Sequence, residues 1–122
     1  MRPWAFAALS LCACAPPGAE DAITYLGLDC AEAFDAQKAA LIAQPHLVPA
    51  PYERAEPYSF YSSDDGRTSY LFTEPGAPGH PAIMMQRAAA GTVTTTGCPY
   101  GDRKAYDELH AYLDSLKAWR RQ

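Results

Sequence analysis

The chain has 122 residues and a net charge of −4 at pH 7, and 20% of its side chains are charged. This length suffices for one compact domain with one hydrophobic core and is too short for two. Acidic and basic residues are spread along the chain in groups no longer than pairs, which argues against nucleic acid as a partner and against a charged tail.

A short apolar run opens the chain. It extends from Trp4 to Ala13 and has ten residues, about half of the roughly 20 that a membrane-spanning helix needs. Only Arg2 and the terminal amine carry positive charge before it. The run is therefore interpreted as a signal segment over residues 1–13 and not as a membrane span.

The run closes on Leu11-Cys12-Ala13-Cys14, which resembles the lipobox of bacterial lipoproteins. The resemblance covers residues 1–15 and implies cleavage after Ala13, with a diacylglycerol linked to Cys14 as the new N-terminus. In bacteria with two membranes, Ala15 resembles the residue that sorts such proteins to the outer membrane. The expected location is the bacterial cell envelope, where the lipid holds the chain at the outer membrane, facing the periplasm.

Other interpretations of this segment remain open. An ordinary signal-peptidase site ending at Ala15 would place the cleaved bond before Pro16, whose ring and missing N–H fit a protease subsite poorly. Cleavage before Cys12 would put the bulky Leu11 where a small residue is required. A buried helix of a cytosolic protein would have to run without amphipathic periodicity into the Pro16-Pro17-Gly18 breaker.

Removal of residues 1–13 would leave nine basic and fourteen acidic side chains, a net charge of −5. Two cysteines would remain besides the lipidated one, Cys30 and Cys98. In an oxidising compartment a disulfide across these 68 positions would stabilise the fold by about 3 to 4.5 kcal/mol. Two free thiols or half of a metal site are alternatives, but neither cysteine has another Cys or His at close ligand spacing.

Residues 14–22 are small and contain two prolines, which suits a tether, and residues 23–122 are expected to form one domain. Asp29 followed by Glu32 resembles a helix N-cap with its capping-box partner and predicts a helix over 30–43. Pro45 ends this helix. The prolines between residues 47 and 57 then forbid a helix and disfavour an interior strand, so this segment is expected to be extended.

Period-two alternation predicts strands at 58–62 and 68–73, joined by an Asp-Asp-Gly turn. A loop at 74–81, rich in proline and glycine, precedes a third strand at 82–88, and a fourth strand follows at 92–96. The glycines at 97 and 101 are expected to end the sheet. Asp102 can cap a helix over 102–119, which carries an apolar stripe at helical spacing.

This order predicts an α+β fold, in which a four-stranded antiparallel meander carries both helices on one sheet face. The disulfide would then tie the two helix starts together at one end. The other face would be open to solvent and would present Tyr61 and Leu71. The covered face would bury the aromatic side chains at positions 58, 60, 70 and 72.

No motif of catalysis or metal binding is present. The histidines His46, His80 and His110 lack metal-ligand spacing, and neither a GxSxG elbow nor a phosphate-binding glycine loop occurs. Asp64 and Asp65 fit a hairpin tip better than a catalytic pair. The sequence therefore predicts a protein that is no enzyme and binds no metal and no cofactor. A hydrolase dependent on His80 is kept as a minor hypothesis.

The expected function is that of a lipid-anchored envelope protein that acts as a periplasmic interaction module, with the membrane and an envelope protein as partners. The candidate binding residues lie on the open face and in loop 74–81: Tyr61, Leu71, Pro75, Pro78 and His80. The alternative is an enzyme inhibitor that inserts loop 74–81 into a cleft, because its prolines reduce the entropy lost on binding. Residues 72–82 also resemble a segment of small uncharacterised bacterial envelope proteins, which implies no activity.

Overall fold

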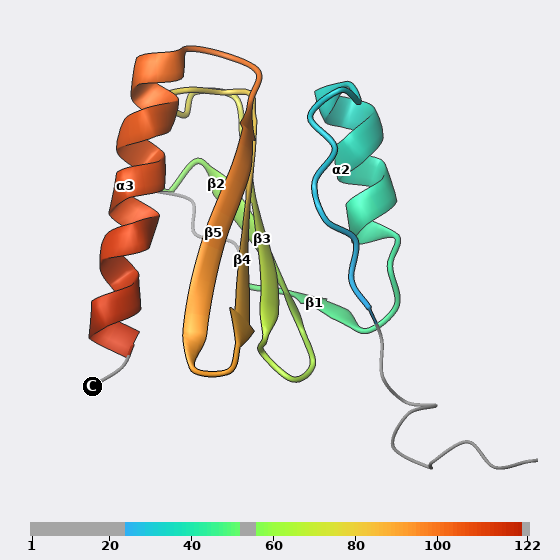
Figure 1. The fold of residues 1–122 in the computed structure, drawn as a ribbon. Helices are drawn as coiled ribbons and strands as arrows, with labels where there is room; N and C mark the ends of the chain where they lie inside the picture. The colour runs from blue at the N-terminus through green and yellow to red at the C-terminus, as the bar shows by residue number, and fades with distance from the viewer. Residues whose placement is uncertain (1–23, 52–55, 121–122) are drawn as a thin grey trace, which may run out of the picture.

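The computed structural model describes residues 24–51 and 56–120, with side chains up to residue 116. The expected signal segment, the lipidated Cys14 and the tether lie outside the described residues. The elements in chain order are α2 (Phe34–Ile42), β1 (Leu47–Pro49), β2 (Tyr58–Ser63), β3 (Thr68–Thr73), β4 (Ala82–Ala89), β5 (Thr92–Pro99) and α3 (Arg103–Arg120) (Figure 1).

The strands form one antiparallel sheet in the order β1-β2-β3-β4-β5, so the predicted α+β class and meander are confirmed. The predicted number of four strands is wrong, because Leu47–Pro49 adds a fifth. This strand pairs with the end of β2 and lies at the edge of the sheet. An edge is the place where a strand tolerates proline, because an N–H that faces outward has no ladder bond to lose.

The two helices lie on opposite faces of the sheet, and the prediction of both on one face is wrong (Figure 1). On β3, Tyr70 and Phe72 pack with Leu41 of α2, whereas Leu71 between them packs with Leu109 of α3. Successive side chains of a strand point to opposite faces. Consecutive apolar residues on β3 and β4 are therefore the signature of a sheet that is covered on both sides.

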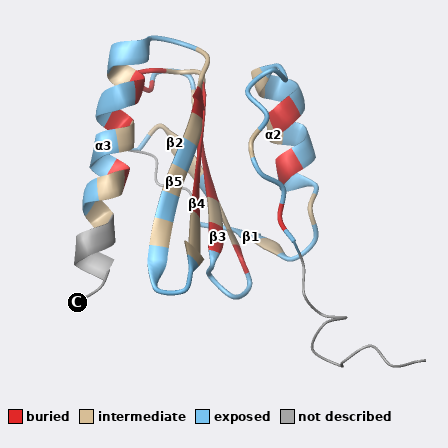
Figure 2. Ribbon diagram, in the orientation of Figure 1, coloured by how far each residue is buried: buried red, intermediate tan, exposed pale blue. Residues whose placement is uncertain are grey.

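Each helix thus has its own core. The core on the α2 side consists of Tyr25, Leu41, Tyr70, Phe72, Ile83 and Met85. The core on the α3 side consists of Leu71, Ala82, Met84, Tyr106, Leu109 and Leu113. Figure 2 shows this division as buried residues that concentrate along β3 and β4, with the exposed sides of both helices turned outward.

The register between β2 and β3 also differs from the prediction. Phe60 pairs with Leu71, and Tyr61 pairs with Tyr70. Antiparallel partners share a face, so Phe60 lies on the α3 side, and Tyr61 lies on the α2 side with Tyr70. The four-residue connection 64–67 sets this register, because it pairs each even-numbered residue of one strand with an odd-numbered residue of the other.

That connection is held by Asp65. Its Oδ1 accepts hydrogen bonds from the Ser63 hydroxyl at 2.7 Å and from the Arg67 N–H at 2.9 Å. The bond from Ser63, followed by that from Arg67, lowers the pKa of the Asp65 carboxyl. The turn chemistry predicted for this tip therefore accounts for the acid.

The segment before α2 packs on the sheet. Tyr25 is 8% exposed, and its hydroxyl donates to the carbonyl of Pro45 at 3.0 Å. Its own carbonyl accepts from the Arg87 guanidinium at 2.7 Å, and the next carbonyl, of Leu26, accepts from the Tyr70 hydroxyl at 2.6 Å. Burial raises the pKa of the Tyr70 phenol. The domain is thus ordered from its first described residues.

Helix α2 starts four residues later than predicted, with Ala33 as its N-cap. Asp29 does not cap it. The Asp29 carboxylate accepts from the N–H of Ala31 at 3.1 Å, and its carbonyl accepts from the N–H of Glu32 at 3.0 Å, which makes a turn. This turn holds Cys30 at the position that reaches β5, so a tertiary constraint overrides the local capping signal.

Strand β5 continues through Gly97, where the sequence predicted its end. A Cβ on Gly97 would lie 2.5 Å from the Tyr106 hydroxyl and 2.9 Å from the carbonyl oxygen of Ile83. Glycine is therefore required here for the close approach of α3 to the sheet and not for a turn. The α3 cap is as predicted, since Asp102 Oδ2 accepts from the N–H of Ala105 at 2.8 Å.

We expect Gly97→Ala to lower the free energy of unfolding by about 1–3 kcal/mol, the usual cost of inserting a methyl group into packed surroundings. Urea denaturation monitored by far-UV circular dichroism measures this change. Gly66→Ala is the comparison, because a Cβ added at this position meets no atom within 4 Å. The variant therefore tests only the cost of placing alanine at a positive φ of 73°. Equal costs at both positions would contradict the assigned close contact with Tyr106.

Candidate functional site

The structure does not bring the five predicted binding residues onto one surface. Tyr61 is half-buried on the α2 side, with its ring edge-on to Phe72 at a centroid distance of 5.8 Å. Leu71 is 4% exposed and lies under α3. The predicted open sheet face is therefore wrong for these two residues, and only the part of the prediction that concerns loop 74–81 still describes an accessible surface.

Loop 74–81 exposes Pro75 and Pro78 and buries Ala77 and Gly79. Two backbone hydrogen bonds shape its turns. The N–H of Ala77 donates to the carbonyl of Glu74 at 3.0 Å, and the N–H of His80 donates to the carbonyl of Ala77 at 3.1 Å. Gly79 has a φ of +79°, and a Cβ there would lie 3.0 Å from the first turn of α3. The loop is thus fixed from beneath while Pro75 and Pro78 are exposed.

His80 anchors this loop to β3. Its Nδ1 lies 2.7 Å from the hydroxyl of Thr73, which also accepts from the N–H of Ala82 at 2.8 Å. Thr73 is 1% exposed. A threonine beside an imidazole resembles a nucleophile with its base. Here the hydroxyl is buried and bonded to the backbone, so no substrate reaches it, and the pair holds the loop in place.

A cluster of mixed polarity adjoins His80 at the start of α2. We name it the loop-end cluster and define it as Phe34, Lys38, Ser59, Glu74 and His80. Lys38 Nζ lies 3.5 Å from Glu74 Oε2, which also accepts from the Ser59 hydroxyl at 2.9 Å. The Phe34 and His80 rings meet edge to face at 5.5 Å. The cluster therefore joins helix, strand and loop.

No sequence pattern predicts the loop-end cluster, because no local motif links residues that are 36 positions apart, as Lys38 and Glu74 are. The lysine also lies over the ring of Phe72, 5.7 Å from its centroid. Both charged side chains are about 30% exposed, so the ion pair contributes at most about 1 kcal/mol. The pair links α2 to the start of the neighbouring loop.

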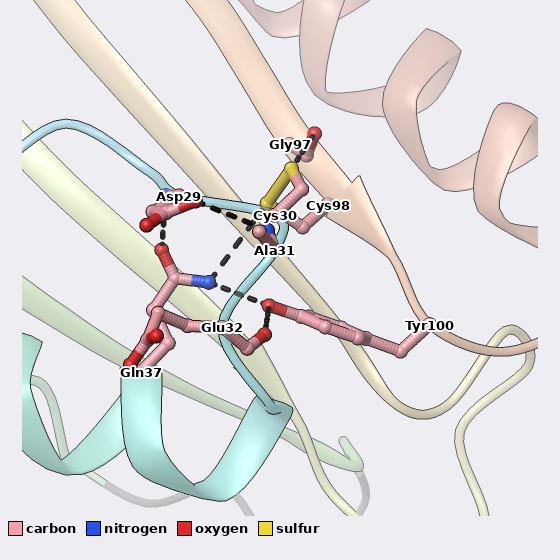
Figure 3. Close-up of a disulfide and its surroundings, with 8 residues drawn as sticks. All are labelled: Asp29, Cys30, Ala31, Glu32, Gln37, Gly97, Cys98 and Tyr100. Atoms are coloured by element: carbon pink, nitrogen blue, oxygen red, sulfur yellow. Dashed lines mark hydrogen bonds between the residues drawn. A yellow bond between two sulfur atoms is a disulfide. The ribbon is translucent and has the colours of Figure 1, made fainter.

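The structure contains the predicted disulfide between Cys30 and Cys98 (Figure 3). Cys98 is completely buried on β5, and Cys30 lies in the exposed turn before α2. The bond therefore joins the segment that precedes one helix to the strand that precedes the other. The helices themselves do not meet, because the sheet lies between them.

Gln37 completes this junction (Figure 3). Its side chain is buried, and its Oε1 accepts from the N–H of Asp29. Its Nε2 donates to the Tyr100 hydroxyl at 2.6 Å, and that hydroxyl donates to the carbonyl of Glu32 at 2.7 Å. Burial raises the pKa of the Tyr100 phenol. The turn that carries Cys30 is thus fixed by hydrogen bonds as well as by the covalent bond.

A small hollow of about 250 Å³ opens where β1 leaves β2. The last bond between the two strands runs from the N–H of Ala50 to the carbonyl of Phe60 at 2.8 Å. The hollow is lined by Pro49, Ala50, Pro51, Tyr58, Ser59, Phe60 and Tyr61. It is smaller than the roughly 300–1,000 Å³ of typical ligand pockets.

Within the described ranges 24–51 and 56–120, no group of three or more His, Cys, Asp or Glu side chains is placed to hold a metal ion. None of the described helices is both long and apolar enough to cross a bilayer. Comparison with known proteins found no matching family model, no matching curated protein and no matching solved structure.

Proposed function

We propose that the chain is an exported, lipid-anchored protein of the bacterial cell envelope that acts by binding another protein and not by catalysis. The observation that carries this proposal is the Cys30–Cys98 disulfide, whose Cα atoms are 5.2 Å apart and whose second sulfur is buried. Structural disulfides persist in exported proteins and are rare in the reducing cytosol. The lipobox over residues 11–14 supplies the export route and the anchor.

The anchor would hold the domain close to the membrane. Thr24, the first described residue, lies ten positions after Cys14, and an extended chain spans at most about 3.3–3.6 Å per residue. The domain would therefore stay within about 35 Å of the lipid. A partner that belongs to the same membrane is always within reach, so even modest affinity suffices for binding.

The exposed prolines of loop 74–81 support a binding role. Pro75 and Pro78 face solvent, while Ala77 and Gly79 beneath them are buried and His80 is bonded to Thr73. A loop that is already ordered loses little entropy on binding. The same property favours the second candidate function, an inhibitor that inserts this loop into the cleft of a soluble enzyme.

The proposed export and lipidation predict the mass of the mature protein. We expect intact-mass spectrometry of membrane-extracted protein to show a chain that begins at Cys14, carries added acyl groups and has two hydrogens fewer than the reduced form. The Cys14→Ser variant should keep its N-terminal segment and lose the acyl mass. A wild-type chain that begins at Met1 would contradict both export and anchoring.

The binding role is tested by in-cell crosslinking and affinity recovery. The lipidated protein is compared with a Cys14→Ser form that carries a cleavable secretion signal, each with and without the paired changes Pro75→Ala and Pro78→Ala. We expect recovery of a membrane protein only with the anchored form, and its loss in the loop variant. Val48→Ala, an exposed change on β1, is the control. Equal recovery of one soluble enzyme with both forms would support the inhibitor instead.

A further inference from the structure

The two edges of the sheet are built differently. At the β1 edge, the N–H of Ala50 donates to the carbonyl of Phe60, so the backbone N–H and C=O groups of even-numbered residues point toward β2. The backbone groups of Leu47, Pro49 and Pro51 therefore point outward. Proline has no N–H to offer. Two of the three outward positions are therefore unable to donate, which is a recognised way to protect a sheet edge from pairing.

The β5 edge lacks this protection. The N–H of Tyr100 donates to the carbonyl of Pro81 at 3.0 Å, so even-numbered residues of this strand bond to β4 and odd-numbered residues face outward. The outward N–H groups belong to Val93, Thr95 and Gly97. In the part of the chain that the structure describes, none of the three has an acceptor.

Other protective devices are also missing along β5. The strand has eight residues and no charged side chain, its only proline is the last residue, and its pairing with β4 runs without a bulge from Ala89↔Thr92 to Ala82↔Pro99. Figure 2 shows β5 largely as exposed and intermediate residues beside the buried β4. A long, uncharged and regular edge is a template for another strand.

Two contacts limit the open part of this edge. Cys30 Sγ lies 3.6 Å from the carbonyl oxygen of Gly97, a contact without a hydrogen because the sulfur is in the disulfide. His110 Nε2 lies 3.4 Å from the carbonyl oxygen of Thr95. The Gly97 end is thus occupied by the turn before α2, and the accessible stretch is Thr92 to Thr95, next to the β4–β5 turn.

We propose that the outer edge of β5, between Thr92 and Thr95, binds an extended segment of a partner polypeptide as a sixth strand. Only an extended backbone presents donors and acceptors that alternate at the spacing of this edge. The proposal rests on the proposed function in one respect, that the partner is a protein. It uses a surface other than loop 74–81.

A second copy of the chain fits this edge less well. If two β5 strands paired antiparallel about Thr95, their α3 helices would lie side by side, because His110 of α3 reaches over that residue. The side chains of Arg103 and Asp107, paired at 3.0 Å, and of His110 and Asp114, paired at 3.4 Å, would then lie between the helices and lose contact with water. Removing paired charged groups from water costs free energy, which disfavours this association.

The test places a photoreactive residue at Thr94, whose side chain is exposed beside the edge, in the full-length exported chain. Two variants are compared. Thr95→Pro removes the outward N–H and leaves the β4 ladder complete, whereas Thr95→Ala keeps the N–H. Loss of one such bond costs about 1.4 kcal/mol, so we expect about tenfold less crosslinking with Thr95→Pro and little change with Thr95→Ala.

The crosslinked residues of the partner reveal whether it binds as a strand. When the probe is moved by two residues, from Thr94 to Thr92 or to Thr96, the crosslinked residue of a strand-like partner should also move by two positions along the partner's sequence. A proline substitution can also disturb folding, so a peptide of the identified partner segment is added to the wild-type chain. We expect it to slow hydrogen exchange of the Val93 and Thr95 amides at least tenfold.

Five outcomes would overturn the proposal. Crosslinking to a second copy of this chain would assign the edge to self-association. Equal yields with Thr95→Pro and Thr95→Ala, or unchanged amide exchange, would show that the backbone edge is not bound. Crosslinking from a probe at Pro78 but not from Thr94 would reject this surface and leave the proposed function intact, whereas no protein crosslinked at either position would reject both.

Discussion

Replacing both Cys30 and Cys98 by alanine is expected to lower the free energy of unfolding by about 4 kcal/mol. The bond closes a loop across 68 sequence positions, and in the chain-entropy model a loop of this length restricts the unfolded chain by about that amount. The whole stability of a domain of this size is about 5–15 kcal/mol. Urea denaturation of the exported protein measures the change.

Reduction supplies the matched control for this prediction. The wild-type protein in excess dithiol should unfold at the same urea concentration as the double-alanine variant, and the reductant should not affect the variant. If the wild type unfolds at an unchanged urea concentration after reduction is verified by mass, the disulfide does not stabilise the fold. A variant much less stable than the reduced wild type would instead show that the completely buried Cys98 contributes through packing.

The second large effect is expected for Leu71→Ala, at about 2–5 kcal/mol. Leu71 is 4% exposed and packs with Leu109 and Leu113 of α3, so its truncation leaves a cavity that the helix and sheet cannot fill. On a sheet with one open face the same change would cost little. Thermal and urea unfolding of the variant therefore distinguish a sheet covered on both faces from one covered on a single face.

Val48→Ala is the apolar control, because Val48 is 54% exposed on the same sheet face and its truncation should change stability by less than about 0.5 kcal/mol. A cost for Leu71→Ala no larger than that of the control would contradict the packing of α3 on the sheet. The adjacent Phe72→Ala, which empties the core under α2, should also be strongly destabilising.

The sequence predicted those parts of the fold that depend on local pattern. Alternation and turn residues placed four strands within a few residues of their observed bounds, and Asp102 with the apolar stripe placed α3. The predicted start of α2 was wrong because the capping signal at Asp29 is local, whereas the turn at this position is held by long-range contacts of Cys30 and Gln37. The prediction that the sheet ends at Gly97 was wrong, because the glycine is needed for a close contact with α3 that no sequence pattern reveals.

The arrangement of the two helices was wrong for a different reason. Amphipathic helices must cover a sheet, but their number does not say on which face each lies. The apolar triplet Tyr70-Leu71-Phe72 carried the missing information, because a strand that is apolar at consecutive positions is buried on both sides. Read in this way, it predicts one helix for each face.

The candidate site was predictable only where the sequence itself forms the surface. Pro75 and Pro78 lie three positions apart in a short loop and are exposed as expected. Tyr61 was assigned to the wrong face because face depends on the register of a hairpin, and a change of one residue in the connection exchanges the faces. Lys38 joins the site through tertiary packing alone.

The position of the disulfide has a mechanical consequence for a chain held by its N-terminus. Cys30 follows the proposed tether and is bonded to the last interior residue of β5, so all strands from β1 to β5 lie within one covalent ring. Tension applied through the proposed lipid anchor would first meet the hydrogen bonds of Tyr25, and at Cys30 it would be carried across the disulfide to the edge strand. The sheet could then not be drawn out residue by residue from the N-terminal side.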